Sequence, residues 1–320
     1  AMGAFAAPQS AEALEALRDG RVAEAEGLLG RVLEEADAAL PAWELGMASA
    51  ARLRALEELM SWDRLQEALR AEPQGAGDDQ LDARVLRAAL GRGIMLSGST
   101  GPADSWDVQR AGGASSRSAV LLAAHAVTRE RPDDARRFIL GGYDAFAEAW
   151  RRIPLLAVRA QHELLSALPL LRAIETALEG RGTVPAVKPL SARHDGFPAW
   201  IDSALSKIAV ARTCRDRQAE ATAYAEIGRH CREAGNLQTA AEMMKHCLKS
   251  RVRQDHQFYD DVFELKLRQR EHPCERLCKV VAAEAAKDKE PPEAFRYYLI
   301  LAKVARAGWE RRELDHAPAW

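Results

Sequence analysis

The sequence has little of what β-sheets are built from. Aromatic residues make up only 6% of the 320 residues, and stretches rich in Val, Ile and Thr are nearly absent. Alanine, leucine, glutamate and arginine dominate instead, and these residue types favour helix over strand. The composition therefore predicts an all-α protein.

Long apolar runs and a basic leader are also missing. No window of the sequence reaches the roughly 18 consecutive apolar residues that a membrane span needs. The first residues, Ala1–Phe5, lack the basic and apolar regions of a signal peptide. We therefore expect an intracellular protein without a membrane partner.

The chain has no excess of positive charge. Its 45 Lys and Arg are opposed by 47 Asp and Glu, which leaves a formal charge of -2 and no net basic field to hold phosphate backbones. Aromatic residues are not interleaved with Lys and Arg along one face, as they are in proteins on which single strands stack. Direct binding of nucleic acid is not expected.

Cysteine is scarce and confined to the last third of the chain. The five cysteines are an odd number, which fits reduced thiols better than a disulfide framework. They are Cys214, Cys231, Cys247, Cys274 and Cys278.

What is present is enough for a folded core. Apolar residues make up 48% and charged residues 29% of the chain, which excludes wholesale disorder. Its 320 residues exceed the usual ~100 to 200 of one compact domain, so we expect two domains or one elongated repeat array. The chain begins without Met at position 1 and stops at Trp320 directly after a helical pattern, so we expect a segment of a longer protein.

Apolar periodicity and helix-start signals predict helices along most of the chain. They cover 11–19, 22–39, 42–60, 62–72, 79–91, 118–130, 133–150, 153–168, 169–180, 198–214, 217–234, 237–251, 256–271, 274–288 and 291–309.

Three segments carry one helix-turn-helix signature: a Gly or Pro at the turn, a small alanine at the close helix crossing and a large apolar residue one turn later. They are Leu17–Leu29, Arg131–Ile139 and Ala234–Met244, with Ala25, Ala135 and Ala240 at the crossings. The segments resemble half of a tetratricopeptide (TPR) unit, but they lie roughly a hundred residues apart instead of at a strict 34-residue period. We therefore predict an irregular α-solenoid of TPR/HAT-like helical hairpins.

Clusters of Gly, Ser and Pro divide this array. We predict N-terminal helical repeats over 1–96, a flexible loop over 97–118, helical hairpins over 119–180, a loop over 181–197 and C-terminal helical repeats over 198–320.

Catalytic motifs are absent from the sequence. It has no Gly-rich phosphate loop after a strand, no HExxH, no GxSxG, and none of the motif pairs that kinases use for base and metal. We therefore predict that the chain is not an enzyme and has no catalytic, cofactor-binding or metal residues.

The best metal candidate is the His272–Cys278 segment, whose Cys274 and Cys278 form a Cys-x3-Cys pair. Zinc needs four ligands, and His230-Cys231 or His246-Cys247 would have to supply the second pair. These cysteines occupy positions where an apolar helix face needs small residues, so we favour a structural core role for them over a metal site.

The charge runs and the tryptophans have equally ordinary interpretations. Arg136-Arg137, Arg151-Arg152 and Lys287–Glu290 are typical of solvated helix faces. The tryptophans lie near helix boundaries beside apolar neighbours, as core anchors do, and the one in the first loop is expected to pack on a helix pair. They are Trp43, Trp62, Trp150, Trp200, Trp309 and, in the loop, Trp106.

Several segments together resemble the FAT region of the phosphatidylinositol-3-kinase-related protein kinases. Leu59–Leu65 is similar to its Leu-x-x-Trp-x-x-Leu element. Arg131–Glu175 looks like its helix order, in which a helix pair that presents Ala precedes a leucine-rich stripe with an acidic end. The block Pro198–Asp202 followed by Ala225–Ala240 is similar to its sequence of a tryptophan, a long gap and a small-residue helix with Ala-Gly-Asn/His-x-x-x-Ala. The resemblance spans roughly 40–255.

This resemblance implies a C-shaped helical scaffold that clasps a Ser/Thr kinase domain located C-terminally in the parent chain. It implies a regulatory role in DNA-damage or growth signalling, protein partners that include the kinase domain, and a nuclear location. The kinase domain itself is not in the sequence, so no catalytic residue is carried over.

Two other functions compete with this one. A free-standing TPR-like adaptor in the cytoplasm would bind a peptide or protein in its concave groove. An enzyme or metalloprotein is disfavoured by the missing motifs.

Overall fold

The computed structural model describes residues 7–35, 40–71, 79–95, 115–154, 157–180, 197–268, 275–287 and 291–315. Within these ranges every regular element is an α-helix, so the all-α prediction is confirmed. The helices are α1 (Pro8–Arg18), α2 (Val22–Glu34), α3 (Ala42–Glu58), α4 (Trp62–Ala71), α5 (Asp79–Met95), α7 (Ser116–Thr128), α8 (Pro132–Arg152), α9 (Val158–Leu165), α10 (Ala167–Leu178), α11 (Phe197–Thr213), α12 (Arg217–Ala234), α13 (Leu237–Lys249), α14 (His256–Arg268), α15 (Glu275–Lys287) and α16 (Pro291–Asp315).

Helix starts agree with the sequence signals better than helix ends do. Helices begin at Trp62, Asp79 and Pro291, as predicted. The predicted start of the helix over 153–168 is wrong, because Ile153 is extended (ψ 126°) before Pro154 and α9 begins at Val158. A proline disfavours helical backbone at the residue before it and lacks the N–H that would continue the ladder.

The two predicted loops lie mostly outside the described residues. Residues 116–118, placed at the end of the first loop, form the start of α7, which the Ser115 hydroxyl caps by accepting from the Ser118 N–H at 3.1 Å. The rest of that loop, with Trp106, and residues 181–196 of the second loop lie outside the described residues.

Five helix–turn–helix connections close in one way. In each, the N–H of the residue directly after the left-handed residue donates to the carbonyl five residues before it, which is the 6→1 bond of the Schellman motif. The bonds are Arg21 N–Ala16 O at 2.8 Å, Ser61 N–Leu56 O at 3.0 Å, Arg131 N–Ala126 O at 2.9 Å, Asp216 N–Ala211 O at 2.8 Å and Asn236 N–Cys231 O at 2.8 Å. Only Gly20 and Gly235 supply a glycine at the left-handed position, whereas Met60, Glu130 and Arg215 occupy it in the other turns.

Consecutive helices pack in pairs, and small residues lie at the crossings. α1 packs on α2, α7 on α8, α12 on α13, and α15 on α16. Ala25, Ala135 and Ala240 are all fully buried, as residues at close helix contacts are expected to be.

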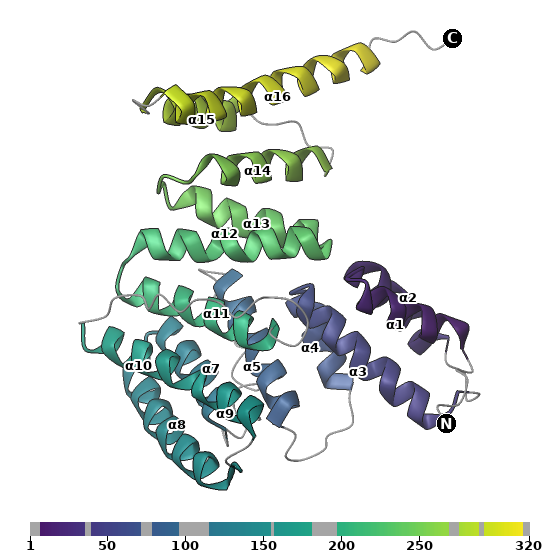
Figure 1. The fold of residues 1–320 in the computed structure, drawn as a ribbon, viewed down its shortest axis with the longest axis vertical. Helices are drawn as coiled ribbons and strands as arrows, with labels where there is room; N and C mark the ends of the chain where they lie inside the picture. Colours follow the sequence, from purple (N-terminus) through teal and green to yellow (C-terminus); the bar gives the residue numbers. More distant parts are fainter. Residues whose placement is uncertain are drawn as a thin grey trace.

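Helix α7 lies at the centre of the lower part of the molecule in Figure 1. It packs against α5, α8, α10 and α11, and almost all of its residues from Ser116 to Val127 are buried. A helix that is apolar around its whole circumference belongs inside a protein. Neighbours far apart in the sequence therefore meet on α7, and one continuous core extends from Leu53 to Ile300.

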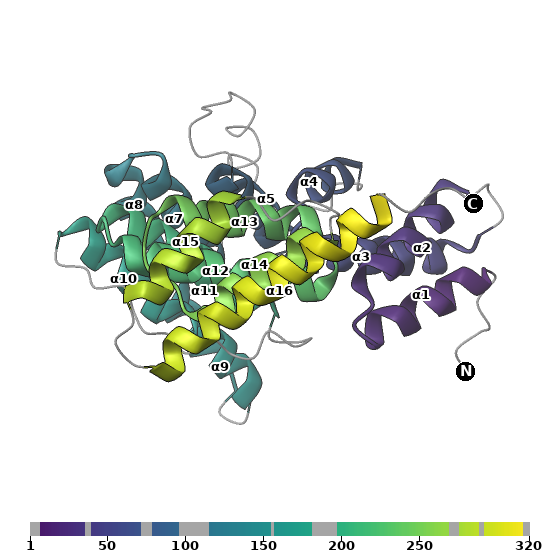
Figure 2. The ribbon, with the colours of Figure 1, turned by 90° about the horizontal axis from the view of Figure 1, so that it is seen from above.

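Above this part, α12, α13, α14 and the α15–α16 pair form successive layers, and α1–α4 lie to one side (Figure 1). Figure 2, which looks down on these layers, shows α16 crossing over α14.

Candidate functional site

Three turns that are far apart in the sequence meet at one junction: those between α1 and α2, α3 and α4, and α12 and α13. Asn236, in the α12–α13 turn, forms hydrogen bonds to the α3–α4 turn. Its Nδ2 donates to the Leu59 carbonyl at 2.7 Å and lies 3.2 Å from the Ser61 hydroxyl oxygen. Its Oδ1 accepts from the Thr239 N–H at 3.1 Å and so caps α13. One side chain therefore starts a helix and fixes a turn 177 residues away in sequence.

Apolar and aromatic groups surround this contact. The Cys231 thiol lies 3.5 Å from the Met60 sulfur, and a Cβ added at Gly235 would lie 3.2 Å from the Cβ of Ala23. His230 packs against both Phe197 and Trp200, with ring centroids 5.0 Å and 4.7 Å away, and those two rings lie 5.8 Å from each other.

The ring of His230 also links α12 to the C-terminal end of α3. Burial lowers its pKa, so the imidazole is neutral near pH 7. Its Nε2 lies 3.1 Å from the Glu58 carbonyl oxygen, to which a neutral ring donates through the N–H at this position. The α12–α13 pair is thereby bonded to the C-terminal end of α3 at both Glu58 and Leu59.

Trp62 anchors the α3–α4 side of the junction. It is 3% exposed, and Leu59 and Leu65 on either side of it are also buried. Its indole lies against α5 at Gly91, where an added Cβ would overlap the ring. The Leu-x-x-Trp-x-x-Leu element is therefore a packing unit, and the prediction that Trp62 is a core anchor is confirmed.

The other tryptophans differ in their environments. Trp200 is 6% exposed, as expected for a core residue, but Trp43 is 51% and Trp150 43% exposed, so the core prediction is wrong for these two. Trp150 stacks on Phe146 of its own helix at 5.8 Å, a contact that leaves its other side open. The side chain of Trp309 lies outside the described residues.

A groove of about 430 Å³ opens at the junction. Helices α2, α4 and α13 all begin beside it, and its walls include Ala23, Met60, Trp62, Arg92, Gln238 and Glu242.

The charged groups of the groove are paired with one another. Glu26 accepts from Arg64 at 2.7 Å, and Asp63 lies 3.1 Å from Arg92. Glu242 lies 3.4 Å from Lys245. Paired charges beside methionine and tryptophan suit a site that binds a peptide better than one that activates a nucleophile.

The predicted metal candidates are separated in the structure. Cys231 and Cys247 are fully buried, and burial raises the pKa of Cys247 to about 12. His246 stacks on Tyr224 at 5.2 Å, away from His230. Across the described ranges no group of three or more His, Cys, Asp or Glu side chains could hold a metal ion. The core interpretation of Cys231 and Cys247 is therefore confirmed, Cys278 is partly exposed, and His272 and Cys274 lie outside the described residues.

A buried ion cluster lies inside the molecule and was not foreseen from the sequence. Arg87 of α5 donates through Nε to Asp202 of α11 at 2.5 Å and through a guanidinium N–H to Glu57 of α3. Arg117 of α7 also donates to Asp202. Burial on its own would raise the pKa of Asp202, but the charges of Arg117 and Arg87 outweigh burial and lower it. The cluster ties four helices together and has a structural role.

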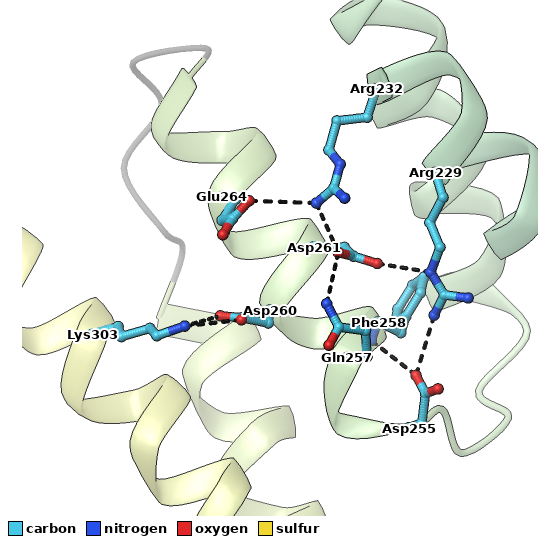
Figure 3. Close-up of polar contacts among 9 residues, drawn as sticks. All are labelled: Arg229, Arg232, Asp255, Gln257, Phe258, Asp260, Asp261, Glu264 and Lys303. Carbon is cyan, nitrogen blue, oxygen red and sulfur yellow. Dashed lines mark hydrogen bonds and ion pairs between the residues drawn. The ribbon is translucent and has the colours of Figure 1, made fainter. Parts of the chain in front are cut away.

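A second cluster joins the upper layers and is drawn in Figure 3. Asp261 of α14, which is 2% exposed, accepts from Arg229 and Arg232 of α12, each at 2.7 Å. Lys303 of α16 bonds both carboxylate oxygens of Asp260 at 2.9 Å. These bonds connect α12 to α14 and α14 to α16.

The predicted solvated faces are confirmed where the structure describes them. Arg136 and Arg137 pair with Asp133 and Asp134 one turn earlier on exposed α8. Arg151 and Arg152 both pair with Glu148. Lys287 pairs with Glu284, and residues 288–290 lie outside the described residues.

Comparison with protein families finds no family model that matches the chain, and comparison with curated proteins and with solved structures finds no match either. Among the described helices, none has the length and apolar character to cross a membrane.

Proposed function

We propose that the chain is a non-catalytic scaffold, built as an irregular α-solenoid of TPR/HAT-like hairpins, that binds and positions other proteins. Two features support this proposal. The helix pairs repeat one turn geometry at five connections, and the successive layers above α11 each pack mainly on their neighbours. The charges that line the groove are committed to ion pairs.

The scaffold, on this proposal, resembles the FAT region of a phosphatidylinositol-3-kinase-related Ser/Thr kinase and regulates a kinase domain outside the segment. Within that family the motif order looks most like the DNA-dependent protein kinase catalytic subunit, which would place the chain in the nucleus and in DNA repair.

One observation carries this proposal. Two of the segments on which the resemblance rests, Leu59–Leu65 and Ala225–Ala240, meet through Ser61 and Asn236, which lie 175 residues apart in sequence. Contact between them is expected if they belong to one packed regulatory unit, and it supports the proposal.

The reading frame of the parent gene beyond Trp320 tests the kinase proposal. We expect it to continue into a kinase domain with a Gly-rich loop, a catalytic-loop Asp and a metal-binding Asp. A stop codon soon after Trp320, or a continuation without these motifs, would show the proposal to be wrong.

The groove favours the alternative, a free-standing TPR-like adaptor that binds a peptide. Peptide display on the purified chain tests it, with Gln238→Trp to fill the groove and Lys249→Trp, exposed on the same helix but outside the groove, as the matched control. Peptides enriched on the wild type and on the control but lost on Gln238→Trp support the adaptor. Equal enrichment on all three proteins would contradict it.

A further inference from the structure

The α1–α2 hairpin is attached to the molecule through apolar clusters of its own. It packs along α3 at one side of the fold (Figure 1). Helix α3 contributes Leu53 and Leu56 to the main core, whereas its Ala48 and Ala55 pack with the hairpin. Because the hairpin's clusters are separate from the main core, the hairpin can move while that core stays intact.

The root of the hairpin is fixed at the end of α3 that lies far from the junction groove. The Ala7 N–H, at the start of α1, donates at 3.0 Å to the carboxylate of Glu44, which is fully buried in the first turn of α3. Glu44 lies roughly 20 Å along α3 from Leu59 in the groove wall, since an α-helix rises 1.5 Å per residue. The larger of the two clusters also joins the hairpin to α3 and consists of Ala13, Leu28, Leu29, Val32 and Ala48.

The tip of the hairpin, Arg18–Ala23, reaches the groove and touches the α12–α13 turn. Val22 packs with Ala55 and Leu59, and Ala234 at the end of α12 packs against this smaller cluster. A Cβ added at Gly235 would lie 3.2 Å from the Cβ of Ala23. The side chains of this contact are few and mostly small, so little apolar surface holds the tip against the turn.

One ion pair spans the groove from the hairpin to α4. Glu26 of α2 accepts from Arg64 of α4 at 2.7 Å, and both residues line the groove. Arg52 of α3 also donates to Glu26, at 3.4 Å. Movement of the tip away from α4 would break the bond to Arg64 and can leave Glu26 bonded to Arg52. Arg64 is already 55% exposed, so its return to water leaves no buried charge without a partner.

We propose that the α1–α2 hairpin is a flap over the junction groove, with its root at Glu44 and its tip closing on the α12–α13 turn. In the closed form, which the structure shows, Ala23 lies beside Gly235 and Arg64 holds Glu26. In the open form the tip leaves the turn, and the groove widens between α2 and α13. The inference rests on the adaptor alternative for its role, because it names the element that admits a peptide to the groove.

Distances between two spin labels on the whole chain test the proposal without any ligand. One label is placed at Lys249→Cys on α13 and the other at Arg18→Cys in the flap tip. The matched control pair combines Lys249→Cys with Ala50→Cys on α3, and all three positions are exposed. The native cysteines that labels could reach are replaced by serine and the two fully buried ones are kept: Cys214, Cys274 and Cys278 are replaced, and Cys231 and Cys247 stay.

We expect two distance populations for the flap pair and one for the control pair, measured by pulsed electron paramagnetic resonance. Arg64→Gln should raise the minor population of the flap pair by about two- to fivefold, because it removes the ion pair that spans the groove. Arg54→Gln is the matched control, since Arg54 pairs with Glu58 within α3 at 2.9 Å, and it should leave the populations unchanged.

Three outcomes would overturn the proposal. These are one narrow distance for both label pairs in the wild type and in Arg64→Gln, equal broadening of the two pairs, and equal effects of Arg64→Gln and Arg54→Gln. Peptide display separates the flap from the adaptor. Two populations without any enriched peptide would support the flap and contradict the adaptor, whereas enriched peptides together with a single distance would contradict the flap alone.

Discussion

Asn236 does two jobs with one amide group. Its oxygen caps α13, and its nitrogen reaches the Leu59 carbonyl of a remote turn. Asparagine is common at helix N-caps for the first reason alone. Only the second links the α12–α13 turn to the α3–α4 turn, and the amide can fill both roles because its nitrogen donates and its oxygen accepts.

Substitutions can separate the two roles. Asn236→Asp keeps the cap oxygen but has no donor for Leu59, whereas Asn236→Ala loses both. In urea denaturation, we expect the free energy of unfolding to fall by about 1 kcal/mol or more for Asn236→Asp and by about 2 kcal/mol for Asn236→Ala.

Asp216→Ala is the control for this pair. Asp216 caps α12 by accepting from the Ala219 N–H at 3.0 Å. The substitution Asp216→Ala should lower the free energy of unfolding by about 1 kcal/mol through loss of the cap alone. If Asn236→Asp were as stable as the wild type, the bond to Leu59 would contribute nothing to the junction.

The buried ion cluster predicts sensitivity to acid. The pKa of Asp202 is lower in the folded protein, so its contribution to stability is present above the unfolded-state pKa and is lost as the pH falls through the folded-state value. The melting temperature should therefore fall below about pH 4, where the carboxyl group of an Asp in the unfolded chain begins to bind protons.

Asp202→Asn tests the source of that effect. It leaves Arg87 and Arg117 facing a neutral amide and should cost about 3 to 5 kcal/mol near pH 7. Its melting temperature should then fall less than that of the wild type between pH 7 and pH 3. Parallel pH profiles for the two proteins would show that Asp202 does not cause the acid sensitivity.

At the scale of elements, α5 shows how close packing depends on a missing side chain. Gly91 lets the indole of Trp62 lie against the helix, whereas Gly93 has open space where a Cβ would be. The same substitution in one helix should therefore have opposite effects.

Gly91→Ala should destabilise the protein by about 1 to 3 kcal/mol, because the new methyl group overlaps the indole ring. Gly93→Ala should stabilise it by up to about 1 kcal/mol through helix propensity. Chemical denaturation of both variants measures the difference, and a stable Gly91→Ala protein would mean that Trp62 does not pack on α5 as described.

The crossings at the three repeat alanines give a second test at this scale. Ala25→Leu, Ala135→Leu and Ala240→Leu should each cost about 1 to 3 kcal/mol, because each alanine is fully buried between helices. The measurement is thermal unfolding, with Ala302→Leu on the exposed face of α16 as the control. Unchanged melting temperatures in all three core variants would show that the helix register is wrong.

The positions of the helices could be predicted from the sequence, but most of the contacts between them could not. Gly20 and Gly235 revealed their turns because glycine favours the left-handed backbone, but the equivalent positions at Met60 and Arg215 carry side chains and gave no signal. Pro154 keeps Ile153 extended, so the helix predicted to start at 153 starts too early. The Asn236–Leu59 contact and the Arg87–Asp202 pair join residues more than 100 positions apart, and a helical period says nothing about which turns or charges meet.

At the scale of the whole molecule, the junction groove and the exposed apolar face of α16, formed by Phe295, Tyr298 and Leu299, are separate parts of one fold. The junction groove lies where α2, α4 and α13 begin, and the apolar face of α16 lies at the outer end of the layers (Figure 1). The α12–α14–α16 ion pairs connect them (Figure 3). A frame of this kind transmits binding at one end to the other only if it has two arrangements of different energy.

The central claim is that the frame supports and regulates a kinase domain outside the segment. Its most direct test is the phosphorylation rate of a Ser/Thr peptide by the whole parent protein, with Asn236→Asp to loosen the junction and Asp216→Ala as the cap control. We predict that Asn236→Asp changes the rate by about fivefold or more while the control does not. A parent protein without kinase activity, or one with the same rate in all three forms, would contradict the account.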